Sequence, residues 1–233
     1  MKVTLKNYPM DADALCGLAA SICTKSSNPE KSRDNAMASG HYSILEHAAF
    51  TFVIEGVSRA LLAQLTRHRI ASFSVESQRY VVQGEENAPY DAAGDKCFPY
   101  VTPLRIREMG EWAMNTFDHQ MRTINSWYKE WREAILEHGG SKQEANEDAR
   151  FVLPNAAETK LMMTMNASEL LHVFGLRCCN KAQWEIRELA WRMLLACKEV
   201  APKTFAAAGP GCVRGHCPEK RSCGRPYANM TEN

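Results

Sequence analysis

Hydrophobic and polar positions define three elements at the beginning of the chain. Residues 2–6 (KVTLK) alternate between apolar and polar side chains, with the two-residue period of a strand. Pro9 and Asp11 then introduce an apolar stretch, residues 14–23, that indicates a helix. Residues 50–56 (FTFVIEG) form a short apolar run of the kind found in a buried strand. The pattern therefore predicts a strand, a helix and a second strand in that order.

Two serines mark the predicted starts of helices in the next part of the chain. Ser43 can cap a short helix, and Ser58 can cap a longer one whose leucines share a face. The pattern in this part predicts helices at 43–49 and 59–69, a loop at 70–77, a strand at 78–82 and a surface excursion at 84–99.

A helical period of apolar and aromatic positions dominates the second half. It begins at Thr102 and Pro103 and continues to Gly139, with a tryptophan and methionine stripe that suits a core or an oligomer interface. Ser141 and Glu144 form the capping-box pattern of a following helix. The rest of the pattern predicts that this helix ends at Pro154, an element at 159–166 that is either strand or helix, a helix at 169–177 capped by Ser168, and a last helix at 181–200.

No internal repeat, low-complexity tract or linker between two cores divides the sequence. We therefore expect one α+β domain over residues 1–207, with a central, mainly antiparallel sheet flanked by long helices. Residues 208–233 are rich in glycine, proline and cysteine, and we expect them to form an appended tail.

Charge and hydropathy argue against some classes of partner. The 233-residue chain has 28 basic and 27 acidic side chains, so no overall field attracts nucleic acid or an anionic membrane. It has no apolar run long enough to span a bilayer and no signal-peptide pattern. Its nine cysteines, an odd number, indicate reduced thiols rather than a disulfide framework. We expect a cytoplasmic protein, in a bacterial or phage-infected cell, that binds neither nucleic acid nor membrane.

One cluster of cations interrupts this even distribution of charge. Residues 67–69 (RHR) are consecutive, and Arg79 follows them after a segment rich in serine, 70–77. Cations at the end of a helix can simply complement its dipole. Like charges repel, however, and guanidinium groups with serine hydroxyls form a common shell around phosphate. Both interpretations, the helix end and the phosphate site, remain open on spacing alone.

The same residues resemble the signature of a known family. R-H-R, seven residues and then a serine is the signature of flavin-dependent thymidylate synthases, and here it runs from Arg67 to Ser77. The flanking segment before it and the segment 150–190 are similar to the family's two conserved blocks, in the same order. The resemblance extends weakly from residue 1 to about 210.

The resemblance implies an activity, its cofactors and an assembly. Members make dTMP from dUMP, with 5,10-methylenetetrahydrofolate as the carbon donor, NADPH as the reductant and FAD as the hydride carrier. They have an α+β fold, form homotetramers and build each active site from several subunits. Neither a cysteine nucleophile nor a metal is implied. We therefore expect a FAD-dependent methyltransferase of nucleotide biosynthesis.

The resemblance also assigns residues to the site. Arg177 is the catalytic candidate, because it is expected to favour the N3-ionised form of dUMP. The predicted dUMP ligands are Gln64, Arg67, Ser77, Gln78, Arg79, Arg150 and Arg177. The predicted FAD ligands are Ser43, Arg67, His68, Arg69, Asn166, Ala167, Ser168 and His172, with His41 and Glu46 in the folate and flavin neighbourhood. The family often has Arg, Asn, and Glu or Gln where this chain has Ser168, His172 and Val75.

The cysteines leave catalytic and zinc-binding interpretations open. Cys178 and Cys179 directly follow Arg177 and suit either packing or covalent catalysis. The tail could instead bind zinc, as part of a zinc-dependent regulator, although its spacing fits no standard pairing. The candidate zinc ligands are Cys212, His216, Cys217 and Cys223. A non-catalytic module that binds nucleotide or RNA through the RHR segment is the main alternative to an enzyme.

Overall fold

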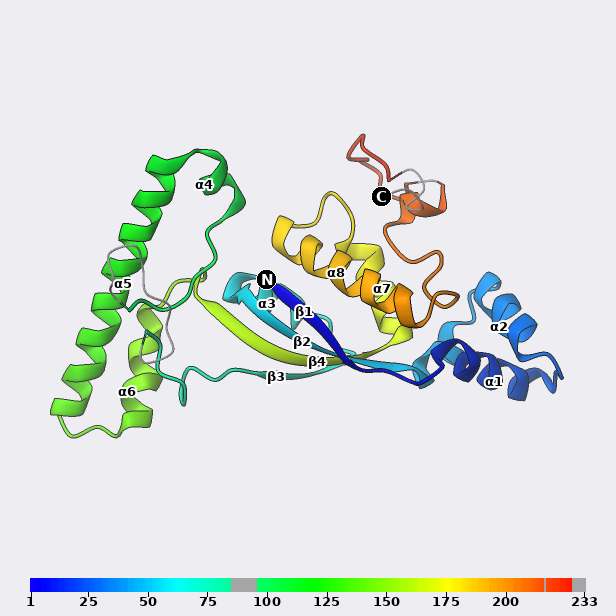
Figure 1. The fold of residues 1–233 in the computed structure, drawn as a ribbon, viewed down its shortest axis with the longest axis horizontal. Coiled ribbons are helices and arrows are strands. Elements are labelled where there is room, and N and C mark those ends of the chain that lie inside the picture. Colours follow the sequence, from blue (N-terminus) through cyan, green and yellow to red (C-terminus); the bar gives the residue numbers. More distant parts are fainter. Residues whose placement is uncertain (85–95, 216, 228–233) are drawn as a thin grey trace. The chain divides into compact units, whose positions relative to one another are not determined.

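The computed structural model describes residues 1–84, 96–215 and 217–227. The chain forms two compact units, each made of segments that are not contiguous in the sequence (Figure 1). Unit 1 comprises Met1–Ile54, Gln64–Ser74 and Met162–Asn233, and unit 2 comprises Glu55–Ala63 and Val75–Leu161.

A four-stranded antiparallel sheet provides the β structure. The strands are β1 (Lys2–Asn7), β2 (Ala49–Ser58), β3 (Ala71–Val75) and β4 (Glu158–Asn166), and their order in the sheet is β1-β2-β4-β3. Alternate residues of β4 are buried, which is the two-residue period of a strand and decides the ambiguity at 159–166. In unit 1 the hydroxyls of Thr51 and Thr164 lie 2.9 Å apart and link β2 to β4.

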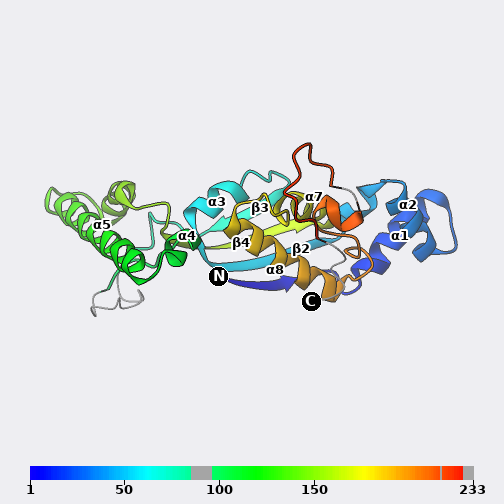
Figure 2. The ribbon, with the colours of Figure 1, turned by 90° about the horizontal axis from the view of Figure 1, so that it is seen from above.

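Helices of unit 1 cover one face of its part of the sheet. They are α7 (Ala167–Arg177) and α8 (Trp184–Val200), which pack against each other (Figure 2). The rings of Phe50, Phe174 and Phe205 pack edge to face beneath them, with centroids 5.4 and 5.9 Å apart. This aromatic cluster fixes α7, the helix that carries most of the candidate site.

A helical pair forms another part of unit 1. It consists of α1 (Ala12–Thr24) and α2 (Pro29–Ala38), followed by the 3-10 helix η1 (Tyr42–His47). The side chain of Asp11 caps α1 by accepting from Ala14 N at 2.8 Å. A Cβ atom at Gly17 would lie 3.0 Å from the carbonyl oxygen of Pro29, so glycine permits the close approach of α1 and α2.

The described part of the tail packs onto the residues that precede α8. It contains the 3-10 helix η3 (Gly211–Arg214). Lys181 forms a 3.1 Å ion pair with Glu219, and Asn180 accepts a hydrogen bond from the hydroxyl of Tyr227 at 2.6 Å. The ring of Tyr227 also lies 5.2 Å from that of Trp191. These contacts hold the described tail residues to unit 1, whereas the predicted boundary at 207/208 stays a prediction.

Unit 2 is a pair of helices with short elements around it. The helices and 3-10 helices that lie in it wholly or in part are α3 (Arg59–Leu65), α4 (Leu104–Glu108), α5 (Glu111–Glu137), α6 (Lys142–Ala149) and η2 (Arg150–Val152). The predicted capping box is confirmed, because Ser141 Oγ accepts from Glu144 N and the Glu144 carboxylate accepts from Ser141 N. A small core that includes Phe98 and Met121 lies against α5.

Several predicted elements are confirmed and others are wrong. The first strand and helix, the strand after residue 49, and the Ser58 cap, whose Oγ accepts from Leu61 N at 3.0 Å, are confirmed. The predicted strand at 78–82 is wrong, because Tyr80 N and Val81 N both donate to Ser77 O and form a turn. The predicted loop at 70–77 contains β3, and α2 was not predicted at all.

Helix ends account for the remaining corrections. The helix predicted at 59–69 ends at Leu65, so the RHR segment follows it. The long predicted helix is divided into α4 and α5 at Gly110, whose φ of 94° favours glycine. Ser43 lies inside η1 and makes no cap, and Asn166 rather than Ser168 caps α7. The predicted excursion at 84–99 lies largely outside the described residues.

Two expectations about the whole chain can be compared with the described residues. None of the helices described is both long and apolar enough to cross a lipid bilayer. All nine cysteines carry free thiols, as the sequence predicts.

Candidate active site

Helix α7 carries three polar side chains of unit 1. Glu169 and His172 lie three positions apart and share a face of α7, and Arg177 follows about two turns after Glu169. The side chain of Asn166 fixes the start of the helix by accepting from Glu169 N at 2.8 Å. The helix therefore begins with a defined orientation of these groups.

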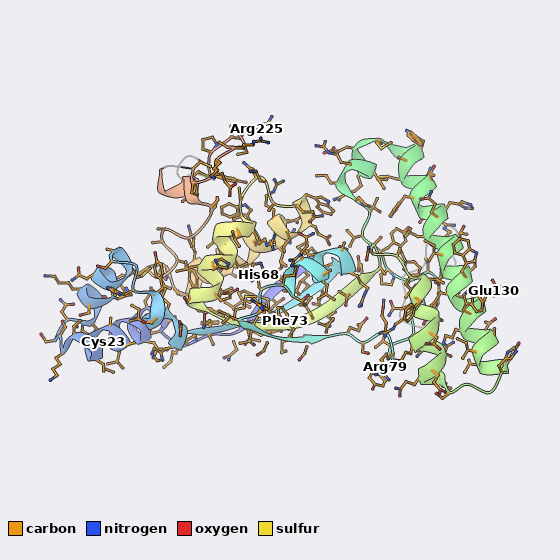
Figure 3. All side chains as sticks on the ribbon, turned by 180° about the vertical axis from the view of Figure 1, so that it is seen from behind. Cys23, His68, Phe73, Arg79, Glu130 and Arg225 are labelled. Carbon is orange, nitrogen blue, oxygen red and sulfur yellow. The ribbon has the colours of Figure 1, made fainter. Side chains whose placement is uncertain are left out.

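His68 lies against α7. It belongs to the segment after α3 (Figure 3). Its exposed fraction is 6%. Its Nε2 accepts a hydrogen bond from Arg177 Nε at 3.0 Å, and its Nδ1 lies 3.4 Å from Glu169 Oε1. The ring of His172 is 6.1 Å from that of His68. His68 thus connects both ends of α7.

The surroundings of His68 keep its imidazole neutral. Burial, and then the positive charges of Arg177 and His172, lower the pKa of His68 to about 4. A guanidinium has N–H donors and no acceptor, so His68 Nε2 must present its lone pair to Arg177. The single ring proton is therefore on Nδ1, which faces the Glu169 carboxylate.

Arg177 keeps most of its hydrogen-bonding capacity. Its side chain is partly buried, and within the described ranges its one hydrogen bond is that from Nε to His68. Its two terminal nitrogens are consequently available to another molecule. Arg67 and Arg69 are exposed, and neither has a carboxylate partner among the residues described. Three guanidinium groups in this unit thus carry uncompensated charge.

The other predicted FAD ligands of unit 1 lie in or next to η1 and at the start of α7, and a backbone hydrogen bond joins these two places. Ala167 N, at the start of α7, donates to Ala48 O, directly after η1, at 2.8 Å. His41, Ser43 and Glu46 are exposed residues in or next to η1, and Gln64 is partly buried. A cavity of about 650 Å³ between α1, α2 and η1 is lined in part by His41 and Ser43. The contact of η1 with α7 therefore brings His41, Ser43 and Glu46 toward the start of α7, where Ser168 is partly buried.

A second group of cations belongs to unit 2. Arg79 forms a 2.8 Å ion pair with Glu147, beside α6 (Figure 3). Arg150 Nε donates to the backbone carbonyl of Glu147 at 3.0 Å. Burial and the charge of Arg150 lower the pKa of Arg59. Arg79 and Arg150 therefore meet at Glu147, one at its carboxylate and one at its backbone carbonyl, and Arg59 lies near Arg150.

The loop before Arg79 adds polar groups to unit 2. Ser77 Oγ accepts from Arg79 N at 3.3 Å, which makes Ser77 a turn former in this state. Gln78 is 5% exposed, and its Nε2 has no hydrogen-bond partner among the described residues. A buried amide without a partner is costly and is typical of a group that a ligand completes. Val75 ends β3 and offers no side-chain polar group.

The sequence interpretation missed two members of these clusters. Arg59 directly follows the Ser58 cap, and its charge could have been added to the basic group. Glu169 was not assigned, although it lies three residues before His172 on a predicted helix. The predicted dUMP ligands are divided between the units: Gln64, Arg67 and Arg177 belong to unit 1, and Ser77, Gln78, Arg79 and Arg150 to unit 2.

Thiol and metal alternatives receive no support from the described residues. Burial raises the pKa of Cys178 to about 12, so this thiol packs in the interior as a neutral group. Within the described ranges no group of three or more His, Cys, Asp or Glu side chains is arranged to hold a metal ion. His216, one of the candidate zinc ligands, lies outside the described residues.

Comparison with known proteins identifies the family. The family model described as thymidylate synthase complementing protein matches residues 4–203. A flavin-dependent thymidylate synthase of Geobacter sulfurreducens is 45% identical over 238 aligned residues, covering 97% of this chain and 94% of the relative. The chain belongs to the flavin-dependent thymidylate synthase family. A second family member, from Nitratidesulfovibrio vulgaris, is 48% identical over 192 residues and covers 81% of this chain and 73% of the relative.

A solved structure of the flavin-dependent thymidylate synthase family has the same fold. The flavin-dependent thymidylate synthase ThyX of Helicobacter pylori, crystallised with FAD and dUMP, aligns with a TM-score of 0.64 and 26% identity. The alignment covers 90% of this chain and the whole of that chain. Membership of this enzyme family decides against the non-catalytic module considered from the sequence.

Proposed function

We propose that this chain catalyses the reductive methylation of dUMP to dTMP, with FAD as cofactor and with NADPH and 5,10-methylenetetrahydrofolate as co-substrates. One observation carries the proposal beyond family membership. The neutral His68 holds Arg177 by one nitrogen, so the two terminal nitrogens of the guanidinium remain free for a substrate. A fixed cation beside a pyrimidine ring stabilises negative charge that develops there.

The residues of unit 1 fit FAD. Its diphosphate needs cations, which the exposed Arg67 and Arg69 can supply without breaking an ion pair. The cavity beside His41 and Ser43, and the start of α7 at Asn166 and Ala167, can hold the rest of the cofactor. FAD supplies hydride transfer when it is bound. Ser168 and His172 depart from the family pattern, so we assign them contacts of lower specificity.

The cations of unit 2 suit the phosphate of dUMP. Arg79 and Arg150 provide paired N–H donors, and the turn at Ser77 and Gln78 adds a hydroxyl, an unpartnered amide and backbone N–H groups. Arg177, with Gln64 and Arg67, is assigned to the base and to its N3-ionised form. The interior position of Cys178 supports a mechanism without a cysteine nucleophile.

A homotetramer is part of the proposal. Three tryptophans of α5, Trp112, Trp127 and Trp131, are 64, 50 and 57% exposed in the single chain. Exposed aromatic residues in a stripe are typical of protein interfaces. The three tryptophans therefore support an oligomer interface rather than a position in the hydrophobic core. We further propose that residues 1–207 form the catalytic domain, which agrees with a family match ending at residue 203, and that the protein acts in the cytoplasm.

Flavin spectroscopy with a matched pair of variants tests the proposal. We expect the purified protein to bind FAD, to lose its flavin absorbance with NADPH under anaerobic conditions, and to form dTMP. Arg177→Ala should retain FAD and fold but lower dTMP formation by about 10²-fold or more. Arg192→Ala, which removes an exposed guanidinium paired with Glu188 on α8, is the control and should retain activity. Full dTMP formation by Arg177→Ala would refute the catalytic assignment.

A further inference from the structure

The Glu169 carboxylate does not cap α7, because Asn166 does so. It lies in the first turn of α7, where a glutamate often faces solvent or the free N–H groups of the helix. Here Asn166 already caps the N–H of Glu169, and the Glu169 side chain is buried. Burial raises the pKa of Glu169. A buried carboxylate is unfavourable unless it has a hydrogen-bonding partner, and the polar atom of His68 nearest to it is Nδ1, at 3.4 Å.

The two ring nitrogens of His68 face groups of opposite hydrogen-bonding character. Nε2 faces Arg177 Nε, which can only donate, and Nδ1 faces Glu169, whose ionised carboxylate can only accept. The tautomer with its proton on Nδ1 satisfies both neighbours. The other tautomer would set two N–H groups against each other at Arg177 and two acceptors against each other at Glu169.

The hydrogen bond to His68 is also what orients Arg177. No other hydrogen bond of the Arg177 side chain exists within the described ranges. If the ring proton moved to Nε2, this bond would be lost and the guanidinium would be free to rotate. The carboxylate at the beginning of α7 therefore acts, through the imidazole, on the arginine at the end of the same helix.

We infer that Glu169 is a positioning residue for the reaction: it holds His68 in the Nδ1-protonated tautomer, and His68 in turn holds Arg177 in the orientation that binds the pyrimidine of dUMP. The inference rests on the proposed function for the identity of the substrate. The tautomer itself does not depend on that proposal. In metalloenzymes, removing a partner that orients a histidine in the same way typically lowers metal affinity or activity by about 10- to 100-fold.

Two variants of Glu169 separate positioning from charge. Glu169→Leu removes the acceptor, and Glu169→Gln retains one oxygen that can accept from Nδ1 but no longer enforces the tautomer. Glu188→Gln removes an exposed carboxylate from α8 in the same unit and is the control for net charge. For each FAD-loaded protein we would measure the Kd of dUMP by equilibrium dialysis, the FAD content and the midpoint of thermal unfolding. The tautomer of His68 would be read from ¹⁵N chemical shifts of histidine-labelled protein.

The expected result is a Kd for dUMP that rises by about tenfold in Glu169→Leu and by less in Glu169→Gln, with unchanged FAD content. In the unsubstituted protein the ring proton of His68 should be on Nδ1. A proton on Nε2, or a dUMP affinity in both Glu169 variants equal to that of Glu188→Gln, would overturn the inference. If Glu169→Leu does not fold, Glu169→Gln and the tautomer of the unsubstituted protein decide it. Failure of the unsubstituted protein to bind dUMP would instead refute the proposed function.

Discussion

Arg177 Nε donates a hydrogen bond to His68 Nε2 across 3.0 Å, although the two residues are 109 positions apart in the chain. The bond requires a neutral imidazole, because a protonated ring has no lone pair to offer. Burial and the nearby positive charges supply that condition by lowering the pKa of His68 to about 4. An arginine proposed to bind the substrate is therefore held by a histidine that carries no charge.

The first prediction concerns the stability of the fold at acidic pH. The pKa of His68 falls from its ordinary value of 6.5 to about 4 on folding, so below 6.5 the unfolded chain binds a proton that the folded chain does not. Proton binding by the unfolded chain therefore lowers the free energy of unfolding as the pH falls from 6.5 toward 4. Above pH 6.5 this loss is absent. We expect a total loss of about 3 kcal/mol. Denaturant unfolding at a fixed protein concentration, between pH 7 and 4, measures it.

The variant His68→Gln isolates this contribution from other titrating groups. Its free energy of unfolding should decrease less steeply over the same pH range. His119→Gln, at an exposed position on α5, is the control and should keep the steep dependence. Equal slopes for His68→Gln and His119→Gln would contradict the depressed pKa.

The second prediction concerns the ion pair between Arg79 and Glu147. If Arg79 binds the phosphate of dUMP, it must exchange a carboxylate 2.8 Å away for the phosphate. Glu147→Gln removes that competitor and one repulsive negative charge. Both side chains are more than a third exposed, so we expect only about a threefold decrease in the Kd of dUMP at low salt. The difference should shrink as salt is added.

Equilibrium dialysis at two salt concentrations would measure this change. Glu108→Gln, which breaks the exposed pair with Arg105 at 2.6 Å, is the matched control and should leave the Kd unchanged. Weaker binding of dUMP by Glu147→Gln would indicate that Glu147 orients Arg79 for the phosphate instead of competing with it.

The third prediction concerns the start of α6, the helix that carries Glu147. Ser141→Ala removes the two hydrogen bonds of the serine hydroxyl, the one it accepts from Glu144 N and the one it donates to the Glu144 carboxylate. We expect the free energy of unfolding to fall by about 1 kcal/mol. Ser126→Ala, an exposed serine inside α5, is the control and should change stability little. The prediction is wrong if the two variants unfold at the same denaturant concentration.

The fourth prediction concerns metal. Cys212, Cys217 and Cys223 belong to no metal-binding arrangement within the described ranges, and the proposed chemistry uses none. Elemental analysis of the FAD-loaded protein should therefore find no stoichiometric zinc, and a chelator should leave dTMP formation unchanged. Stoichiometric zinc whose removal abolishes activity would revive the zinc site in the tail.

The sequence predicts most elements with a strong apolar period and misses those without one. β1, α1, β2 and α8 each carry an apolar pattern that matches their period. Helix α2 (PEKSRDNAMA) has few apolar residues, and its best-buried side chain is Arg33, which pairs with Asp34 at 2.8 Å. Strand β3 has no fully buried position, so its alternation between polar and apolar residues is weak.

Local chemistry explains the other errors in predicted boundaries. Residues 78–82 contain β-forming side chains, but the carbonyl of Ser77 accepts two backbone hydrogen bonds and bends the chain into a turn. Asn166 and Ser168 are both good caps, and only the geometry at the end of β4 shows which one is used. Gly110 divides a helix whose apolar period continues through it.

The candidate site was predictable as a set of residues but not as an arrangement. The RHR signature indicates Arg67, His68 and Arg69 from a short stretch of sequence. The contact of His68 with Glu169 and Arg177 depends on the packing of two segments distant in sequence, which a local pattern cannot encode. For the same reason the charges of Arg59 and Glu169 became relevant only in three dimensions.

The proposed function requires this chain to use bound FAD in the methylation of dUMP. The most direct test is to supply FAD-loaded protein, without oxygen, with dUMP, 5,10-methylenetetrahydrofolate and NADPH, and to quantify dTMP and oxidised NADPH together. We expect dTMP in an amount equal to the NADPH oxidised, and no dTMP when FAD is removed. Oxidation of NADPH without dTMP, or dTMP formation that persists without FAD, would contradict it.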